Sequence, residues 1–240
     1  MKIDIWSDYA CPFCYIGKRR LENALSQFPH RDQVEVVFRS FQLDPSAKVH
    51  GNPNIHDMLA AKYGMTRDKA IAMNEQLAEQ ARGVGLDFQF DSIVPTNTFD
   101  SHRLTHYATK QGKGAEMTER LLRAYFTDSV NLGDRSVLTQ LAGEIGLNEQ
   151  ETLDMLESDA YADQVNGDIE EGQRLGVTGV PFFVVNNKYA ISGAQPGPVF
   201  TEVLDTVWAE EQKAPGLQLV GTDSSKASSD DGCSDGSCGI

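Results

Sequence analysis

Basic side chains are scarce in this 240-residue sequence, which has 21 Lys and Arg against 35 Asp and Glu and a formal net charge of −14. Binding to nucleic acid or to an anionic membrane surface normally requires a clustered basic patch. The basic cluster Lys18-Arg19-Arg20 lies in a predicted short helix, where we expect a solvated helix face rather than an anion site. The composition therefore argues against nucleic-acid and membrane partners.

Long apolar runs are also missing, because no uninterrupted stretch approaches the roughly 20 residues that a membrane helix needs. Met1 is followed almost at once by the alternating segment that starts at Ile3, which leaves no room for a secretory signal. We therefore expect a cytoplasmic protein. With 40% hydrophobic and 23% charged residues, the chain has the composition of an ordinary globular protein.

Cysteine is rare, with four residues that form two pairs, Cys11 with Cys14 and Cys233 with Cys238. In a cytoplasmic protein such cysteines favour catalytic, redox-sensing or metal-binding roles over a structural disulfide framework. The sequence contains no Gly-rich dinucleotide loop, phosphate loop or serine nucleophile elbow, so nucleotide-binding and hydrolase functions have no support.

Two histidines, His102 and His106, are four residues apart in a predicted helix, which is the spacing of two metal ligands on one face. Arg103 stands where the glutamate of a hydrolytic metal site would follow the first histidine. We therefore expect packing roles for both histidines and no bound metal.

The first part of the chain has the pattern of a β-α-β unit. Residues 2–6 and 34–38 alternate as half-buried strands do, and residues 15–28 between them have helical spacing. The period then becomes helical from Asn54 to about Gly176, where we expect a block of about five helices.

The last part of the chain has the pattern of a β-β-α unit. Residues 182–185 and 189–192 are short strand-like runs, and Asn186-Asn187 between them tolerates the positive φ angles of a tight turn. Residues 199–211 then carry apolar side chains on one helical face.

These elements predict an α/β protein with one sheet, built from the β-α-β and β-β-α units, and a large inserted all-helical block. Residues 1–53 and 177–212 are expected to form the sheet domain, and residues 54–176 the inserted helical domain. Residues 213–240 are rich in Ser, Asp and Gly and cannot bury enough apolar surface to order themselves, so we expect a flexible tail.

The spacing of Cys11 and Cys14 is ambiguous by itself, because half of a zinc site has the same C-x-x-C pattern. Their context favours redox chemistry, since the pair follows a strand and opens a helix with Pro12 in its first turn. The free amides and positive dipole of that helix end favour a thiolate at Cys11. We predict that Cys11 is the exposed nucleophile and that Cys14, one turn deeper, resolves the mixed disulfide.

A second feature is Gly179-Val180-Pro181, which stands just before the predicted hairpin. A proline that opens a strand suits a cis peptide bond and leaves an open edge for a substrate peptide, although most X-Pro bonds are trans. Together with Pro12 and Phe13, we regard Val180 and Pro181 as candidate substrate-binding residues.

The order strand, C-P-F-C, helix, strand, helical insertion, G-V-P, hairpin and helix resembles the thioredoxin fold of the DsbA family of thiol-disulfide oxidoreductases. The segments WSDYACPFCYIGKRRLE and GVTGVPFFVVNNKYAISGAQP closely resemble its cytoplasmic FrnE-like branch. The resemblance implies that Cys11 and Cys14 are the redox pair and that Val180-Pro181 is a cis-proline platform. It also implies protein or peptide thiols and disulfides as substrates, an unidentified redox partner, no bound cofactor, and glutathione as a candidate redox co-substrate.

Two positions depart from the family pattern. Many members keep a buried acid, which accepts a proton, at the position that Ile5 occupies here, and alternation places its neighbours Asp4 and Asp8 on one face. The proton acceptor therefore stays unassigned. Phe13 stands in place of the histidine of periplasmic DsbA, which removes one cationic stabiliser of the thiolate.

Several alternatives stay open. The pair Cys233 and Cys238 could exchange disulfides with Cys11 and Cys14, could be inert, or could join them in a four-thiolate zinc site. Related folds include glutathione-dependent isomerases and transferases of the 2-hydroxychromene-2-carboxylate isomerase type, although a serine commonly stands at the Cys11 position there. A redox-switched binding module without turnover is the remaining class.

Overall fold

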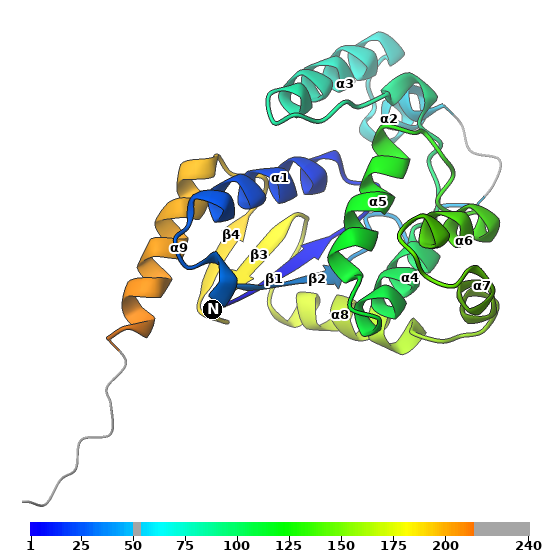
Figure 1. The fold of residues 1–240 in the computed structure, drawn as a ribbon. Helices are drawn as coiled ribbons and strands as arrows, with labels where there is room; N and C mark the ends of the chain where they lie inside the picture. The colour runs from blue at the N-terminus through cyan, green and yellow to red at the C-terminus, as the bar shows by residue number, and fades with distance from the viewer. Residues whose placement is uncertain (50–53, 214–240) are drawn as a thin grey trace, which may run out of the picture.

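The computed structural model describes residues 1–49 and 54–213, and its centre is a four-stranded mixed sheet in the order β2-β1-β3-β4 (Figure 1). β1 (Lys2–Ser7) pairs in parallel with β2 (Glu35–Ser40) and antiparallel with β3 (Phe182–Val185). β3 also pairs antiparallel with β4 (Tyr189–Ser192). The predicted α/β fold, with one sheet built from both ends of the chain, is confirmed.

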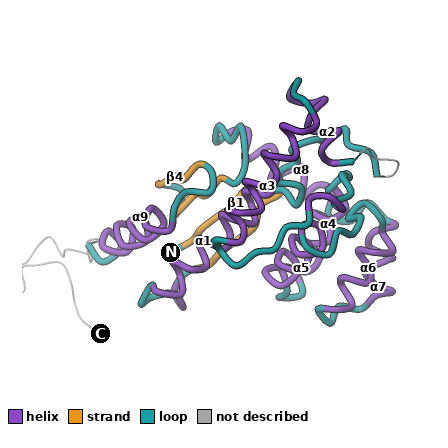
Figure 2. Tube along the Cα trace, turned by 90° about the horizontal axis from the view of Figure 1, so that it is seen from above, coloured by secondary structure: helices purple, strands orange, loops and turns teal. Residues whose placement is uncertain are grey.

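Helices α1 (Pro12–Gln27) and α9 (Gly197–Glu211) pack against each other and against one face of the sheet (Figures 1 and 2). Their shared core includes Ile5 of β1, Phe183 of β3 and Phe200 of α9. On the opposite face the indole Nε1 of Trp6 donates to the carbonyl oxygen of Asp168, at 2.8 Å. The sheet is therefore covered on both sides.

β1 is a central strand that is buried on both faces, so the prediction of a half-buried strand is wrong. The side chain of Asp4, whose burial the alternation does not reveal, is buried. Asp4 Oδ1 forms ion pairs with Arg39 at 2.8 Å and with Lys2 at 3.0 Å. These partners compensate for the burial of the carboxylate and allow it to lie inside the sheet layer.

The described part of the chain has seven α-helices between β2 and β3, so the expectation of about five is wrong. They are α2 (Ile55–Tyr63), α3 (Arg67–Arg82), α4 (Phe99–Lys110), α5 (Gly114–Phe126), α6 (Arg135–Glu144), α7 (Glu149–Glu157) and α8 (Ala162–Arg174). Short 3-10 turns cover Arg31–Gln33 and Phe90–Ser92. Helix α2 buries only Ile55 and His56, and α4 buries polar side chains, so neither carries a strong apolar stripe.

The basic cluster of α1 is not a solvated face. Lys18 is buried, and its ammonium contacts Glu22 and Glu119 of α5. Arg19 reaches the same Glu119 at 2.7 Å. The predicted solvated face is therefore wrong, because α5 supplies a carboxylate that the sequence of α1 does not reveal.

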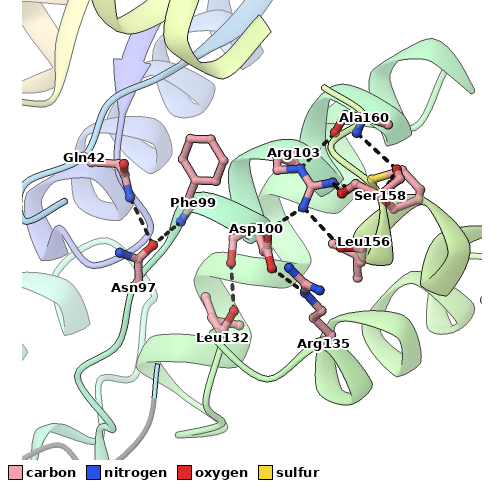
Figure 3. A network of polar contacts seen from close by, with 12 residues as sticks. Gln42, Asn97, Phe99, Asp100, Arg103, Leu132, Arg135, Leu156, Ser158 and Ala160 are labelled. Atoms are coloured by element: carbon pink, nitrogen blue, oxygen red, sulfur yellow. Dashed lines mark hydrogen bonds and ion pairs between the residues drawn. The ribbon is translucent and has the colours of Figure 1, made fainter. Parts of the chain in front are cut away.

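Arg103 of α4 holds the connection between α7 and α8 (Figure 3). Its guanidinium is buried and donates to Asp100 at 2.6 Å, to the carbonyl oxygen of Ala160 at 2.8 Å, and to carbonyl oxygens at Met155, Leu156 and Ser158. Asp100 also accepts from Arg135 at 2.8 Å. A single buried side chain therefore satisfies the carbonyl groups at the end of α7.

No helix among the described residues is both long and apolar enough to cross a lipid bilayer.

Candidate active site

Cys11 and Cys14 lie where β1 passes into α1. The amide of Cys11 donates to the carbonyl oxygen of Asp8 at 3.1 Å, and the amide of Cys14 donates to that of Cys11 at 3.0 Å. Both cysteines are free thiols, and the Cys14 thiol hydrogen-bonds to the Cys11 sulfur. The two sulfur atoms are therefore close enough to interact directly.

Cys11 itself has only 4% of its surface exposed, so the prediction of an exposed nucleophile is wrong. Its Sγ donates to the carbonyl oxygen of Val180 at 3.4 Å. Cys11 precedes the first residue of α1, but its side chain makes no capping hydrogen bond there. In this dithiol state the Cys11 thiol proton is hydrogen-bonded to the Val180 carbonyl oxygen, and the Cys11 side chain is buried.

The Val180–Pro181 peptide bond is cis. Pro181 leads into β3, and its carbonyl oxygen accepts from the Gly193 amide at 2.8 Å. Gly17 of α1 lies directly against this segment, since a Cβ atom there would be 3.1 Å from Cγ of Pro181. The fold thus brings the C-P-F-C and G-V-P segments, which are far apart in the sequence, to one site.

Cys14 is buried more deeply than Cys11. Burial raises the pKa of the Cys14 thiol, and the hydrogen bond and charge of Cys11 raise it further. The Ser7 hydroxyl and the Asp8 backbone amide donate to the sulfur and act in the opposite direction. Cys14 therefore stays a neutral thiol even when Cys11 is a thiolate.

A cavity of about 420 Å³ adjoins Cys11, and helices α2 and α3 form much of its wall. Most of its lining side chains are apolar and include Ile55, Met58, Leu59, Met73, Leu77, Phe90, Ile93, Tyr125 and Phe126. Phe13, Leu43 and Tyr63 also line it, with 40%, 41% and 58% of their surfaces exposed. The volume fits a small ligand or a few side chains of a larger one.

Asp8 lies beyond the end of β1 and does not share a strand face with Asp4, so that expectation is wrong. Its carboxylate accepts from the amide of Leu43 at 2.7 Å, in the loop after β2. Ser7 and the cavity residues of α2 and α3 were not predicted from the sequence. Ser7 ends β1 just before the cysteines, but no local pattern marks it, and only the packing of the helices between β2 and β3 brings the α2 and α3 residues to the site.

The second cysteine pair, Cys233 and Cys238, lies outside the described residues, so its exchange with Cys11 and a shared zinc site stay predictions. Within the described ranges, no cluster of three or more His, Cys, Asp and Glu side chains could hold a metal ion. His102 and His106 instead face Asp8 and Asp168, at 3.4 Å and 3.1 Å.

Comparisons with known proteins agree with this fold. The DSBA-like thioredoxin domain matches residues 2–205. The crystal structure of a probable DsbA oxidoreductase from Streptomyces coelicolor is 43% identical, with a TM-score of 0.85, and the match covers 92% of this chain and 94% of that chain. The range matched by the DSBA-like domain contains Cys11, Cys14 and the Val180–Pro181 bond.

Two further proteins are similar to this chain, one in structure and one in sequence. The structure of a 2-hydroxychromene-2-carboxylate isomerase has a TM-score of 0.66 at 14% identity, over 89% of this chain and 98% of that chain, which is a likeness of fold alone. The uncharacterized protein YwbO of Bacillus subtilis (strain 168) is 29% identical over 213 residues, which cover 88% of this chain and 97% of YwbO.

Proposed function

The chain belongs to the DSBA-like thioredoxin domain family, and from this premise we propose that it catalyses thiol-disulfide exchange with protein substrates through Cys11 and Cys14. The observation that carries the proposal is the pair of free thiols at the start of α1, hydrogen-bonded to each other and set against the backbone of Val180.

In the proposed cycle the Cys11 thiolate attacks a substrate disulfide, and one substrate sulfur leaves as a thiolate. Cys14 then attacks the Cys11 sulfur, which breaks the mixed disulfide and releases the second substrate sulfur. Two electrons pass from the cysteine pair to the substrate. The reverse sequence oxidises a substrate dithiol, and the relative reduction potentials of the two couples set the direction.

The cavity beside Cys11 supports a substrate with large apolar side chains near its cysteine. Its lining is mostly apolar, and the exposed rings of Phe13 and Tyr63 extend this surface outward. Exposed apolar patches of this kind mark binding sites for proteins or apolar ligands. We therefore infer that protein segments with apolar flanking residues are better substrates than small polar disulfides.

The cavity is less suited to glutathione. Asp8 and Asp44 line it, and Lys62 is the one cation among its described lining residues. Glutathione carries two carboxylates, which these acids would repel. Cys11 also speaks against a glutathione-dependent isomerase, because a serine commonly stands at this position in such enzymes.

The proposal is tested by insulin reduction, with the wild type compared with Cys11→Ser and Cys14→Ser. We expect multiple turnovers for the wild type and none for Cys11→Ser. Cys14→Ser should trap a mixed disulfide. Partner binding that depends on the redox state but shows no turnover would identify a binding module instead.

Substrate preference is tested with two peptide disulfides, one with Phe and Leu beside the cysteine and one with Ser at both places. The apolar peptide should react faster, and Tyr63→Ser should reduce this advantage. Leu175→Ser is the control, because Leu175 is another large hydrophobic residue with half of its surface exposed, at 50%, and it does not line the cavity. Faster exchange with glutathione disulfide than with either peptide would contradict the substrate proposal.

We also infer a cytoplasmic location and a place in the FrnE-like branch, on the resemblance of the two motif segments. A relay through Cys233 and Cys238 is part of this proposal. Replacing both with serine should lower the turnover with a cellular reductant. Unchanged turnover and an unchanged reduction potential would exclude the relay.

A further inference from the structure

Resolution of the mixed disulfide requires Cys14 to lose a proton from a buried position. In the dithiol, the Cys11 sulfur is a hydrogen-bond partner of the Cys14 thiol. In the mixed disulfide the Cys11 sulfur is bonded to the substrate and carries no charge. The Ser7 hydroxyl is then the side chain that remains in contact with the thiol.

Ser7 also lines a small cavity of about 10 Å³ beneath the active site, which is room for one water molecule. All of its lining residues except Phe38 carry a polar group in the side chain, and these are Ser7, Tyr9, Arg39, Ser40, His102, Thr105, His106 and Thr118. His102 supplies an independent sign that this cavity needs a hydrogen-bonding occupant. Its Nε2 is the one buried side-chain nitrogen or oxygen without a hydrogen-bond partner in the described part of the chain. Asp8 is 3.4 Å from it, but without hydrogen-bond geometry.

His106 lines this cavity and also reaches solvent, because 21% of its side chain is exposed. Its Nε2 is 3.1 Å from Oδ2 of Asp168 in α8 and 3.2 Å from Oγ of Ser40 in β2. Arg39 of β2 pairs with the same Asp168 at 3.0 Å, and Asp4 of β1 pairs with Arg39. The charged groups around His106 thus include two carboxylates and one guanidinium, and the nearest is a carboxylate.

Asp168 is suited to stabilise a protonated His106. Burial alone would raise the pKa of Asp168, but hydrogen bonds from His106 and from the Ser40 amide outweigh it and hold that pKa below its ordinary value. Tyr9 is unsuited as an acceptor. Burial raises its pKa to about 12, and its hydroxyl is already hydrogen-bonded to Thr105.

We propose that Ser7, one water molecule in the small cavity and His106 carry the Cys14 proton toward solvent. The proposal rests on the proposed function, because it concerns its second step. The Cys14 S–H bond breaks, its proton passes to the Ser7 oxygen, and the hydroxyl proton moves through the water to the imidazole of His106, which becomes an imidazolium. The Cys14 thiolate attacks the Cys11 sulfur and is oxidised, while the substrate sulfur is reduced and leaves with the electron pair of the broken bond. In the reverse direction the imidazolium returns the proton.

The test separates the two chemical steps with an aromatic disulfide, dithiobis(nitrobenzoate), which releases a coloured thiolate at each step. Full-length protein with Cys233→Ser and Cys238→Ser keeps only Cys11 and Cys14 as thiols. Attack by Cys11 gives the first coloured phase, and attack by Cys14 gives the second.

We expect Ser7→Ala and His106→Gln to leave the first phase unchanged and to slow the second about tenfold at neutral pH. This lies below the roughly 10²–10⁴-fold effect of a direct acid or base, because the acceptor acts through a water. The difference from the wild type should narrow as the pH rises and hydroxide takes the proton directly. Ser7→Thr, which keeps the hydroxyl, should recover the rate. His30→Gln is the control, because His30 stacks on Trp208, with ring centres 3.9 Å apart, away from the cysteines.

An unchanged second phase in both variants would overturn the proton relay. Equal slowing of both phases would also overturn it, because that result indicates a structural effect. If Asp8→Asn slows the second phase and His106→Gln does not, the proton leaves through Asp8 and the proposal is wrong. A wild-type protein that shows no second phase at all would refute the proposed function rather than the relay.

Discussion

Replacing Gly17 with alanine measures how tightly α1 packs against the Val180–Pro181 segment. In an ordinary helix interior this change stabilises a protein by about 0.5–1 kcal/mol. At Gly17 the new Cβ would lie 3.1 Å from Cγ of Pro181 and 3.2 Å from Cζ of Phe183, which is fully buried. Neither ring can turn away, and extra volume in a packed region costs about 1–3 kcal/mol. The expected net change lies between no effect and a loss of about 2 kcal/mol.

Gly167 provides a matched control. It lies within α8, and a Cβ built there has no neighbour within 4 Å. Gly167→Ala should therefore be stabilised by its higher helix propensity alone. The difference in unfolding free energy between the two variants then gives the packing cost at Gly17. With a urea slope near 3 kcal/mol per molar, a difference of 2 kcal/mol separates the two midpoints by about 0.7 M.

The same change should slow disulfide exchange. Moving α1 away from Pro181 lengthens the 3.4 Å contact between Cys11 Sγ and the Val180 carbonyl oxygen, and the peptide-binding edge moves with it. Exchange with the apolar peptide disulfide should fall in Gly17→Ala and stay at the wild-type rate in Gly167→Ala. If Gly17→Ala is as stabilising as Gly167→Ala and exchange is unchanged, α1 does not pack on this segment as described.

Three further predictions concern the framework of the site. Arg103→Met should lower the unfolding free energy in urea by about 3–5 kcal/mol, because Asp100 and several carbonyl groups lose a buried donor; a loss below 1 kcal/mol would contradict this. Asp168→Asn should lower the free energy of unfolding at neutral pH. Because the folded protein holds the pKa of Asp168 below 3.8, the difference in unfolding free energy from the wild type should vanish as the pH falls through the folded pKa. A difference that stays constant in urea titrations across this pH range would argue against the prediction. Gly172→Ala places a Cβ 2.8 Å from Trp6 Nε1, so we expect a loss of about 1–3 kcal/mol and a changed Trp6 fluorescence; an unchanged spectrum and midpoint would refute the contact.

Local signals in the sequence predicted the ends of the fold well. The hairpin strands have the predicted bounds, and both Asn186 and Asn187 have positive φ, at 50° and 53°. Within the helices between β2 and β3, the pair Asn148 and Glu151 has the spacing of a helix cap, and Asn148 does cap α7 by accepting from the Glu151 amide at 3.0 Å. Turn and cap chemistry depends on a few neighbouring residues, so one sequence is sufficient to identify it.

Features that depend on distant partners could not be predicted. The sequence predicts a helix around His102 and His106, but it does not reveal that α4 buries Arg103, whose partners lie in the α7–α8 connection. Lys18 is buried only because Glu119 of α5 lies opposite it. The burial of Cys11 and the contact of Ser7 with Cys14 likewise follow from tertiary packing, and alternation along a strand carries no information about either.

The strand order has a consequence for the chain while it is being synthesised. β1 and β2 leave the ribosome first, but β3, which fills the other edge of β1, starts only at Phe182. Until then β1 has an unpaired edge beside two reactive thiols, and the long sequence separation delays closure of the sheet. While the helices between β2 and β3 are translated, the nascent polypeptide is therefore most vulnerable to incorrect disulfides and to strand pairing with other chains.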